Sequence, residues 1–322
     1  MPKISIKDTQ FAIEDIKNYF QKLIKKSLKL TRVTAPLFLD AKLEVNDNLT
    51  GVEPSVKFHP KHLNKELEVV QSLAKWKRIA LKKYEFKKNE GIYTDMNAIR
   101  ANEVTDYCHS IYVDQWDWEL VISKHNYNLN FLYKIVEKFY KCLLKLEKKI
   151  NSTYLDLTKK LPKKIYFITS KELYDLYPNV SSKERENLIA KEHKAVFISQ
   201  IGDYIENTSE RHDLRAKDYD NWSLNGDLIV YHEQSNKALE LMSLGIRVDA
   251  DSLIKQANLN VNEKENLPLY YQMILNNQLP LTIGGGLGQS RLCMFLLEKQ
   301  HIGEVQVSVW TDLETENNKF IL

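Results

Sequence analysis

The sequence predicts an α+β fold in which helices flank a largely antiparallel sheet. Predicted strands mostly follow other strands, with helices grouped between them, whereas a doubly wound parallel sheet would alternate the two. Hydrophobic residues make up 43% and charged residues 28% of the 322 positions, as in an ordinary globular protein. No internal repeat and no break in composition marks a second domain, so we expect one domain over residues 1–322.

The N-terminal half begins with an amphipathic helix, since apolar residues recur at helical spacing through residues 6–30. Pro36 makes the next segment an edge strand or a loop. Ser72 precedes a helical pattern and is placed to cap its first turn. The predicted order is helix 6–30, extended segment 31–39, loop 44–56, strand 66–71, helix 72–84, and strands 91–100 and 109–123.

The strand at 109–123 carries polar groups on both faces. Its two-residue period divides the side chains into Tyr112, Asp114, Trp116 and Trp118 on one face and Val113, Gln115 and Asp117 on the other. Two explanations are open. Either one face is solvated, or Gln115 and Asp117 line a polar pocket above the sheet.

The C-terminal half continues with a long amphipathic helix. Ser181 and Glu184 have capping-box spacing and predict that a later helix begins at residue 182. Residues 233–236 join two strand patterns into a hairpin. The predicted order is helix 128–157, strand 164–169, helices 170–176 and 182–194, strand 196–201, polar connection 202–223, hairpin arms 227–232 and 238–248, two helices within 251–277, glycine-rich segment 282–288, helix 289–299 and strand 305–310.

Four of only ten glycines occur at positions 284, 285, 286 and 288, directly before a predicted helix. Glycine allows a close backbone approach or a positive φ angle. The segment is neither a Walker A loop nor a G-x-G-x-x-G fingerprint. It is either a tight loop packed under the helix or a ligand-facing floor. Arg291 at the helix start favours the second, because a guanidinium there can stack on a planar base or hold phosphate.

The hairpin carries two carboxylates, Asp227 and Glu240. If paired residue numbers sum to 469, Glu240 lies opposite Ile229 and shares a face with Asp227; a sum of 470 places them on opposite faces. In the first register the two carboxylates form a binding site for Mg²⁺ that is bound together with nucleotide phosphates. Arg247 ends the same arm, where a buried ion pair and a ligand carboxylate explain it equally well.

Several classes of protein are disfavoured by the sequence. No apolar run is long enough to span a membrane, and the start lacks the apolar core of a signal peptide, so we expect a cytoplasmic location. The net charge of +3 gives no electrostatic support for a nucleic-acid partner. Neither H-E-x-x-H nor G-x-S-x-G occurs. The cysteines are odd in number and scattered, which fits a reducing cytosol and supports neither a zinc site nor disulfides: Cys108, Cys142 and Cys293.

Eight motifs are spread along nearly the whole chain, and their order and spacing together are far more specific than any one of them. They are residues 72–78, Arg100, and residues 112–118, 211–213, 218–220, 225–227, 245–249 and 284–291. In this order and spacing they resemble the ammonia-dependent asparagine synthetase (aspartate–ammonia ligase) family.

The resemblance implies the catalytic domain of class II aminoacyl-tRNA synthetases, with an antiparallel sheet, flanking helices and a homodimer. It also implies a reaction in which L-aspartate, ammonia and ATP give L-asparagine, AMP and pyrophosphate through a β-aspartyl-adenylate. A carboxylate is not electrophilic, so it must first attack the α-phosphorus of ATP. That step brings two anions together and needs cations at the phosphate.

By this resemblance, Arg100 bridges the α-phosphate and the reacting carboxylate, while Arg291 packs on the adenine and γ-phosphate side. The metal pair for Mg²⁺ is Asp227 with Glu240. Candidates for holding the aspartate carboxylates are Lys77, Gln115 and Arg247, and candidates for its ammonium are Asp47 and Asp117. The base that takes protons from ammonium is Asp47 or Asp220. The remaining candidates near nucleotide or substrate are Ser72, Ser110, Val113, Ser243 and Gly286.

Two other functions share the adenylating core. An aspartyl- or asparaginyl-tRNA synthetase is disfavoured, because the pattern begins near the start of the sequence and leaves no room for an anticodon-binding module. A non-catalytic paralogue is disfavoured by the presence of Arg100, Arg291, Asp227 and Glu240 together. A glutamine-dependent synthetase would need a nucleophile such as an N-terminal cysteine, and position 2 is Pro.

Overall fold

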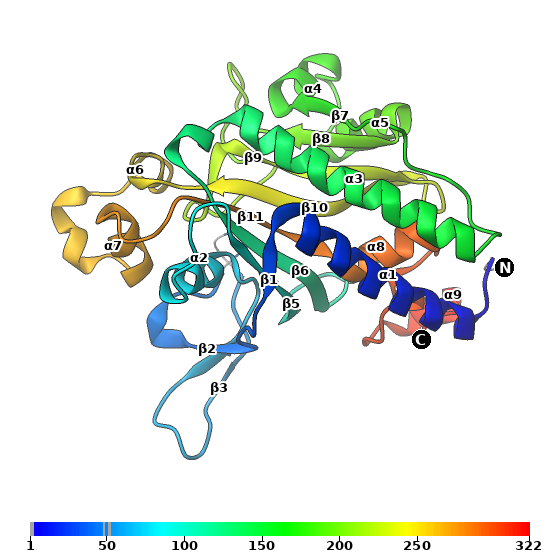
Figure 1. Cartoon of the computed structure of the whole chain (residues 1–322), viewed down its shortest axis with the longest axis horizontal. Coiled ribbons are helices and arrows are strands. Elements are labelled where there is room, and N and C mark those ends of the chain that lie inside the picture. The colour runs from blue at the N-terminus through cyan, green and yellow to red at the C-terminus, as the bar shows by residue number, and fades with distance from the viewer. Residues whose placement is uncertain (1–2, 48, 51–52) are drawn as a thin grey trace.

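A computed structural model describes residues 3–47, 49–50 and 53–322, and its main element is an eight-stranded sheet (Figure 1). The interior pairs are antiparallel, and only the outermost pairs, β1–β5 and β7–β8, are parallel. The predicted α+β class with a largely antiparallel sheet is therefore confirmed. The strands in order across the sheet are β1 (Leu30–Arg32), β5 (Gly91–Ile99), β6 (Tyr112–Val121), β11 (Thr282–Gly288), β10 (Lys237–Arg247), β9 (Asp220–His232), β8 (Ala195–Ser199) and β7 (Tyr166–Thr169).

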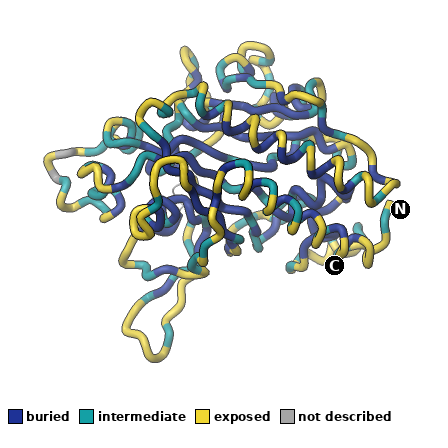
Figure 2. Tube along the Cα trace, in the orientation of Figure 1, coloured by how far each residue is buried: buried dark blue, intermediate teal, exposed yellow. Residues whose placement is uncertain are grey.

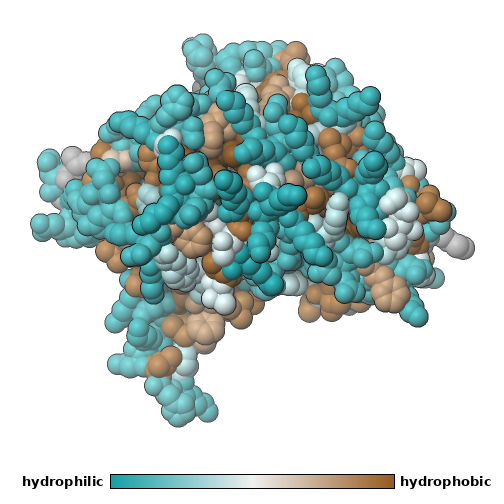
Figure 3. Space-filling model, viewed as in Figure 1, coloured by the Kyte–Doolittle hydropathy of each residue, from teal (hydrophilic) through white to brown (hydrophobic). Residues whose placement is uncertain are grey.

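One face of this sheet is covered by two long helices, α1 (Ile6–Leu28) and α3 (Leu129–Thr153), which lie side by side (Figure 1). The ring of Phe20 packs 4.9 Å from Trp116, and Phe139 packs 4.7 Å from Trp118. Both tryptophans are fully buried, so this face of β6 forms the core. Figure 2 shows the inner sides of these elements buried, and Figure 3 shows hydrophilic side chains spread over their outer surface.

Helix α2 (Ala74–Lys83) lies on the opposite face near β5 and β6, and α4 (Ser170–Leu176) and α5 (Ser182–His193) lie near β7, β8 and β9. A small antiparallel sheet projects from the body in Figure 1 and consists of β2 (Phe38–Asp40), β4 (Leu67–Val69) and β3 (Lys57–Phe58). The remaining helices are η1 (Ala41–Leu43), η2 (Lys124–Asn126), α6 (Ala250–Ala257), η3 (Val261–Asn266), α7 (Leu269–Leu275), α8 (Gln289–Leu296), η4 (Ile302–Glu304) and α9 (Asp312–Asn317). Among the helices of the described residues, none has the length and apolarity needed to cross a membrane.

Three details of the sequence prediction are wrong, and one alternative that the sequence left open is decided. The predicted connection 202–223 ends early, because β9 already begins at Asp220. Residues 305–310 form no strand: they pair with none of the described strands, and Val307 and Val309 do not pack into the core. Helix α2 begins at Ala74, and its N-cap residue is Leu73 and not Ser72. The Ser72 Oγ atom nevertheless accepts a hydrogen bond from the Ala74 amide. The glycine-rich segment is strand β11 and not a loop.

The β9–β10 hairpin has, at its tip, the first of the two registers that the sequence left open. Glu240 lies opposite Ile229, which is the 469 register. A bulge at Leu241 then shifts the pairing by one residue, so that Asp227 lies opposite Ser243. Glu240 and Asp227 consequently share one face of the sheet, as the first register predicts. A second irregularity lets residues 221–224 bulge out of β9 between Asp220 and Asn225.

Candidate active site

A cavity of about 410 Å³ lies over β6, β11, β10 and β9, on the face that carries α2 and α5. Its size is in the range of small-molecule sites. Of the predicted site residues, Asp227 does not line it. Those that do are Asp47, Ser72, Lys77, Arg100, Ser110, Val113, Gln115, Asp117, Asp220, Glu240, Ser243, Arg247, Gly286 and Arg291.

The floor of the cavity is β11, and its glycines make room for the polar side chains of β6. Gly284 lies opposite Glu119, and Gly286 lies opposite Asp117. A Cβ atom on Gly284 would come 1.8 Å from Glu119 Oε2, and one on Gly286 would come 2.3 Å from Gln115 Oε1. Gly284 and Gly286 are thus required because the side chains of β6 leave no room for a Cβ atom on β11. Gln115 and Asp117 do line a polar pocket, which settles the alternatives for β6.

One end of the cavity, which we call the Arg247 end, is built from buried ion pairs of Lys77, Asp117, Glu119, Asp220 and Arg247. Arg247 is 2% exposed and donates through Nε and Nη2 to Glu119 and through Nη1 to Asp220. Burial would raise the pKa of Glu119, but the Arg247 guanidinium holds it below its usual value. Arg247 is therefore a buried ion-pair residue that also faces the cavity.

Lys77 at the same end is fixed by α2, which points its side chain at the sheet. Its Nζ lies 3.0 Å from Asp117 Oδ2 and donates to the carbonyl oxygen of Gly285 at 3.1 Å. Both charged side chains are almost completely buried. Lys77, a candidate for binding a carboxylate, and Asp117, a candidate for binding an ammonium, therefore lie next to each other as a preformed ion pair.

The two candidate bases have different surroundings. Burial, with a smaller effect of Asp218, raises the pKa of Asp47 to about 6. Asp47 Oδ1 accepts a hydrogen bond from the Leu49 amide at 2.9 Å. Burial also raises the pKa of Asp220, while Arg247 opposes this effect and binds the carboxylate directly. Asp47 is the carboxylate whose proton affinity suits transfer near neutral pH.

The other end, which we call the Glu240 end, comprises Arg100, Lys183, Arg215, Glu240 and Arg291. The Arg100 Nε atom is buried and has no hydrogen-bond partner among the described residues. Arg291 donates from Nε to the Cys108 carbonyl at 3.2 Å, and its Nη1 lies 3.8 Å from Glu240 Oε2. Strand β10 runs from Glu240 to Arg247 and, at about 3.3 Å per residue, separates the two ends by roughly 20 Å.

The predicted metal pair has oxygen donors that suit a magnesium ion. Asp227 Oδ1 is a buried atom without a hydrogen-bond partner among the described residues, while Oδ2 is bound by Arg215. Burial, reinforced by Glu240 and opposed by Arg215, raises the pKa of Asp227 to about 7. A buried carboxylate of this kind is stabilised by a nearby cation, and carboxylate oxygens are preferred Mg²⁺ ligands.

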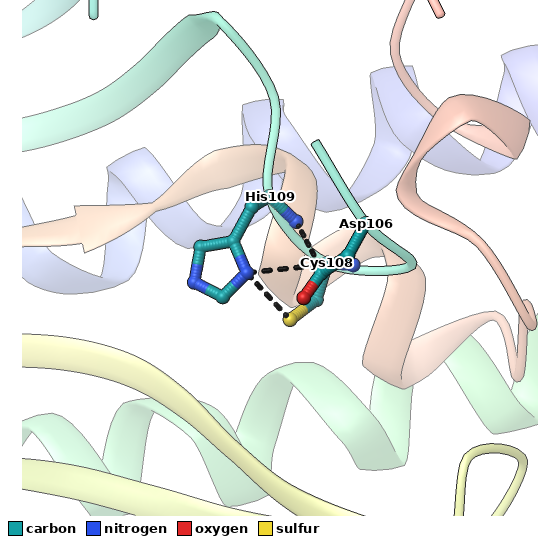
Figure 4. Close-up of side chains that lie close together, drawn as sticks. All are labelled: Asp106, Cys108 and His109. Atoms are coloured by element: carbon teal, nitrogen blue, oxygen red, sulfur yellow. Dashed lines mark hydrogen bonds and ion pairs between the residues drawn. The ribbon is translucent and has the colours of Figure 1, made fainter. Parts of the chain in front are cut away.

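A turn with Asp106, Cys108 and His109 forms part of the cavity wall (Figure 4). Asp106 Oδ1 accepts hydrogen bonds from the backbone amides of Cys108 and His109 and from the His109 Nδ1 atom, each at 2.8 Å. The carboxylate hydrogen bond raises the pKa of His109 to about 9. Because Oδ1 is already used three times and Nδ1 carries a proton, the turn presents an imidazolium to the cavity and is poorly suited to a metal.

Sequence reasoning missed Glu119, His109, Lys183 and Arg215. The strand period places Glu119 on the same face as Gln115 and Asp117, so a longer reading of β6 would have found it. No comparable signal marks Lys183, which is one of many helical lysines, or Arg215, which lies outside regular structure.

The profile of the family described as aspartate-ammonia ligase matches residues 7–320. The chain belongs to the aspartate–ammonia ligase family. It is 54% identical to the aspartate–ammonia ligase of Ureaplasma parvum, over 96% of this chain and 94% of the relative. It is 50% identical to that of Clostridium tetani, over 96% of this chain and 91% of the relative.

The fold of this aspartate–ammonia ligase family member is similar to class II synthetases. Asparaginyl-tRNA synthetase from Entamoeba histolytica, in complex with asparaginyl-adenylate, has a TM-score of 0.65 at 14% identity, over 94% of this chain and 66% of that chain. The Pyrococcus horikoshii enzyme has a TM-score of 0.66 at 15% identity, over 92% and 67%. At such identities the likeness shows the fold alone. The family match and the 50–54% identity over nearly the whole chain favour the ligase over a tRNA-charging enzyme and over a non-catalytic paralogue.

Proposed function

We propose that the protein makes L-asparagine from L-aspartate, ammonia and ATP through a β-aspartyl-adenylate, releasing AMP and pyrophosphate. The observation that carries the proposal is one cavity with cations at both ends, in a chain of the aspartate–ammonia ligase family. Lys77 and Arg247 lie at one end, and Arg100 and Arg291 lie at the other.

In the first step, an oxygen of the aspartate β-carboxylate attacks the α-phosphorus of ATP, and the bond to pyrophosphate breaks. Arg100 holds the α-phosphate beside the attacking carboxylate and offsets the growing negative charge. Its unpartnered Nε supports this role, because a buried donor without a partner can bind a ligand oxygen at no cost in internal hydrogen bonds. Arg291 and the His109 imidazolium act on the nucleotide from the same cavity, where Ser110, Val113, Ser243 and Gly286 also contact it.

Aspartate is selected by the Arg247 end. Lys77, Gln115 and Arg247 bind its carboxylates, and Asp117 accepts from its ammonium, with Ser72 as a further hydrogen-bond donor. The buried ion pairs support this because their charges are fixed before the substrate enters, which lowers the cost of ordering the site.

In the second step, ammonia attacks the acyl carbon of the adenylate, and AMP leaves with one oxygen of the former carboxylate. Ammonium must lose one proton to become a nucleophile and a second once the C–N bond has formed. We assign the proton acceptor to Asp47, since its pKa of about 6 leaves it ionised at neutral pH and able to hold a proton transiently. Asp220 orients Arg247 instead.

Magnesium would be held by Asp227 and Glu240, and when bound it would offset the charge of the ATP phosphates. We further propose that residues 1–322 act as one catalytic domain, that two copies form a homodimer, and that the enzyme works in the cytoplasm without a nucleic-acid partner. Light scattering of the purified protein tests the homodimer, which a monomeric mass would exclude.

The decisive experiment is pyrophosphate release from ATP with aspartate, with and without ammonium, together with analysis of the amino-acid product. We expect asparagine and AMP only with ammonium, and a loss of about 10³-fold or more in Arg100→Ala. Arg32→Ala is the matched control, because Arg32 is 60% exposed and pairs with Asp95 outside the cavity. Turnover that requires tRNA would overturn the ligase assignment.

A further inference from the structure

We propose that Lys183 and Arg215 form the subsite for pyrophosphate, the leaving group of the first step. The inference rests on the proposed function. Both side chains line the cavity at the Glu240 end, and neither belongs to the residues predicted from the sequence. Lys183 comes from the first turn of α5, and Arg215 from the segment before β9.

The direction in which pyrophosphate leaves the α-phosphorus indicates the Glu240 end of the cavity. In displacement at phosphorus, the attacking oxygen and the leaving oxygen lie on opposite sides of the phosphorus atom. The aspartate carboxylate attacks from the Arg247 end. Pyrophosphate must therefore leave away from it, toward the Glu240 end, which lies roughly 20 Å along β10.

Arg215 is positioned as a fixed donor. Its side chain is 17% exposed, its Nη2 binds Asp227 Oδ2, and its Nη1 lies 3.6 Å from Asp213 Oδ2. These contacts orient the planar guanidinium and use only part of its five N–H groups. Glu240 also lies close enough to Arg215 to raise its pKa electrostatically. Arg215 thus sits among the carboxylates that would hold a phosphate-bound cation, where a phosphate oxygen would be expected.

Lys183 is positioned as a movable donor. Its Nζ lies 3.0 Å from Glu186 Oε2, and its side chain is 75% exposed, whereas that of Glu186 is 8% exposed. Glu186 is held in turn by His212 Nε2 at 3.1 Å. An anchored acid therefore keeps a flexible lysine at the cavity rim. An exposed ion pair of this kind is weak, so the ammonium can exchange to a phosphate oxygen at little cost.

The pair explains how a highly charged product can be bound and still released. Pyrophosphate gains charge-assisted hydrogen bonds from both cations. Neighbouring carboxylates Asp213, Asp227 and Glu240 limit the net positive charge of the subsite and keep the complex from becoming too stable. AMP, which lacks the β- and γ-phosphates, should not depend on either side chain.

The test measures binding of inorganic pyrophosphate and of AMP separately, by calorimetry with Mg²⁺ present, in wild type, Lys183→Ala and Arg215→Lys. We expect pyrophosphate affinity to fall about tenfold or more in each variant, while AMP affinity changes by less than about twofold. Lys183→Arg should restore most of the binding. Lys191→Ala is the matched control, since Lys191 is on the same helix but does not line the cavity.

Unchanged pyrophosphate affinity in both variants would overturn the subsite, as would an equal loss of AMP binding, which would indicate a general structural effect. A wild-type protein that binds no pyrophosphate would also overturn it. Pyrophosphate binding that depends on Lys183 and Arg215, in a protein that makes no asparagine, would support the subsite and reject the proposed ligase reaction. The two failures are therefore distinguishable.

Discussion

The two ends of the cavity hold similar numbers of charges in different ways. At the Arg247 end, Lys77, Asp117, Glu119 and Arg247 are at most 3% exposed and form short ion pairs. At the Glu240 end, Arg291 is 22% exposed, Glu240 34% and Lys183 75%, and the Arg291–Glu240 pair is 3.8 Å long. Under the proposed function, the small amino acid meets closely packed, buried charges, and the larger triphosphate meets more exposed cations.

Removal of the central arginine from each end should show the largest contrast. Arg247→Ala leaves Glu119 and Asp220 as uncompensated buried charges and should cost about 3–5 kcal/mol of unfolding free energy. Arg291→Ala should cost only about 1 kcal/mol, although it weakens ATP binding. Urea unfolding of both variants measures the difference. Equal losses would mean that the two ends are equally rigid.

Asp47→Asn should reduce kcat by about 10²- to 10⁴-fold, because the proton acceptor is lost. Wild-type activity should fall as pH decreases through about 6, where Asp47 becomes protonated. The variant should lack this acidic limb when free NH₃ is held constant. Asp220→Asn is the comparison, since a limb that vanishes there and persists in Asp47→Asn would transfer the role to Asp220.

Asp47→Asn should also be more stable than wild type at pH 8. The folded-state pKa of Asp47, about 6, lies above its unfolded value of about 3.9, so folding favours the protonated form and stability is lost as pH rises between these values. The uncharged Asn side chain of the variant removes this cost of ionising a buried carboxylate, which is worth at most about 3 kcal/mol of unfolding free energy. Thermal unfolding at pH 8 measures the gain, and a lower melting temperature would argue against a strained, ionised Asp47.

Gly284→Ala tests how tightly the Arg247 end is packed. The new Cβ would meet Glu119 Oε2 at 1.8 Å and Arg247 Nη2 at 2.6 Å, so the ion pair must move. We expect a loss of about 1–3 kcal/mol and a KM that rises more for aspartate than for ATP. Gly288→Ala is the matched control, where the nearest atom lies at an ordinary 3.4 Å. A tolerated Gly284→Ala would show that the end is not rigid.

The smallest effect is expected at His109. Its pKa of about 9 keeps the imidazolium charged at neutral pH, and the charge is lost as pH rises through that value. The KM for ATP should therefore increase about two- to fivefold above pH 9 in wild type. In His109→Ala it should be raised already at pH 7 and show no further step. His125→Ala, at an exposed position in η2, should behave as wild type.

Periodicity and turn chemistry predicted most of the fold. Helices α1 and α3 follow from their apolar spacing, and α5 from Ser181, because these signals are local. The segment 305–310 has the alternation of a strand, but it pairs with no strand of the described sheet, and Val307 and Val309 are left exposed. Local preference was overridden there by tertiary arrangement.

The candidate site was predictable where the resemblance or the strand period named a residue. The hairpin pattern left two registers open for Glu240, and only the structure decides between them. The bulge at Leu241 could not be predicted either, because a one-residue shift leaves no sign in the sequence. Lys183 and Arg215 could not be predicted, since only the folded chain brings α5 and the segment before β9 to the same cavity. The pairing of Lys77 with Asp117 is likewise a property of packing.

The position of β11 has a consequence for how the protein is made. This strand, residues 282–288, lies between β6 (Tyr112–Val121) and β10 (Lys237–Arg247), which both precede it in the chain. Until it emerges, the growing polypeptide must hold two inner strands with unpaired edges, which are templates for association with other chains. The cavity floor is thus completed last during biosynthesis. Chaperone demand should be concentrated in this late interval and should fall once the glycine strand has inserted.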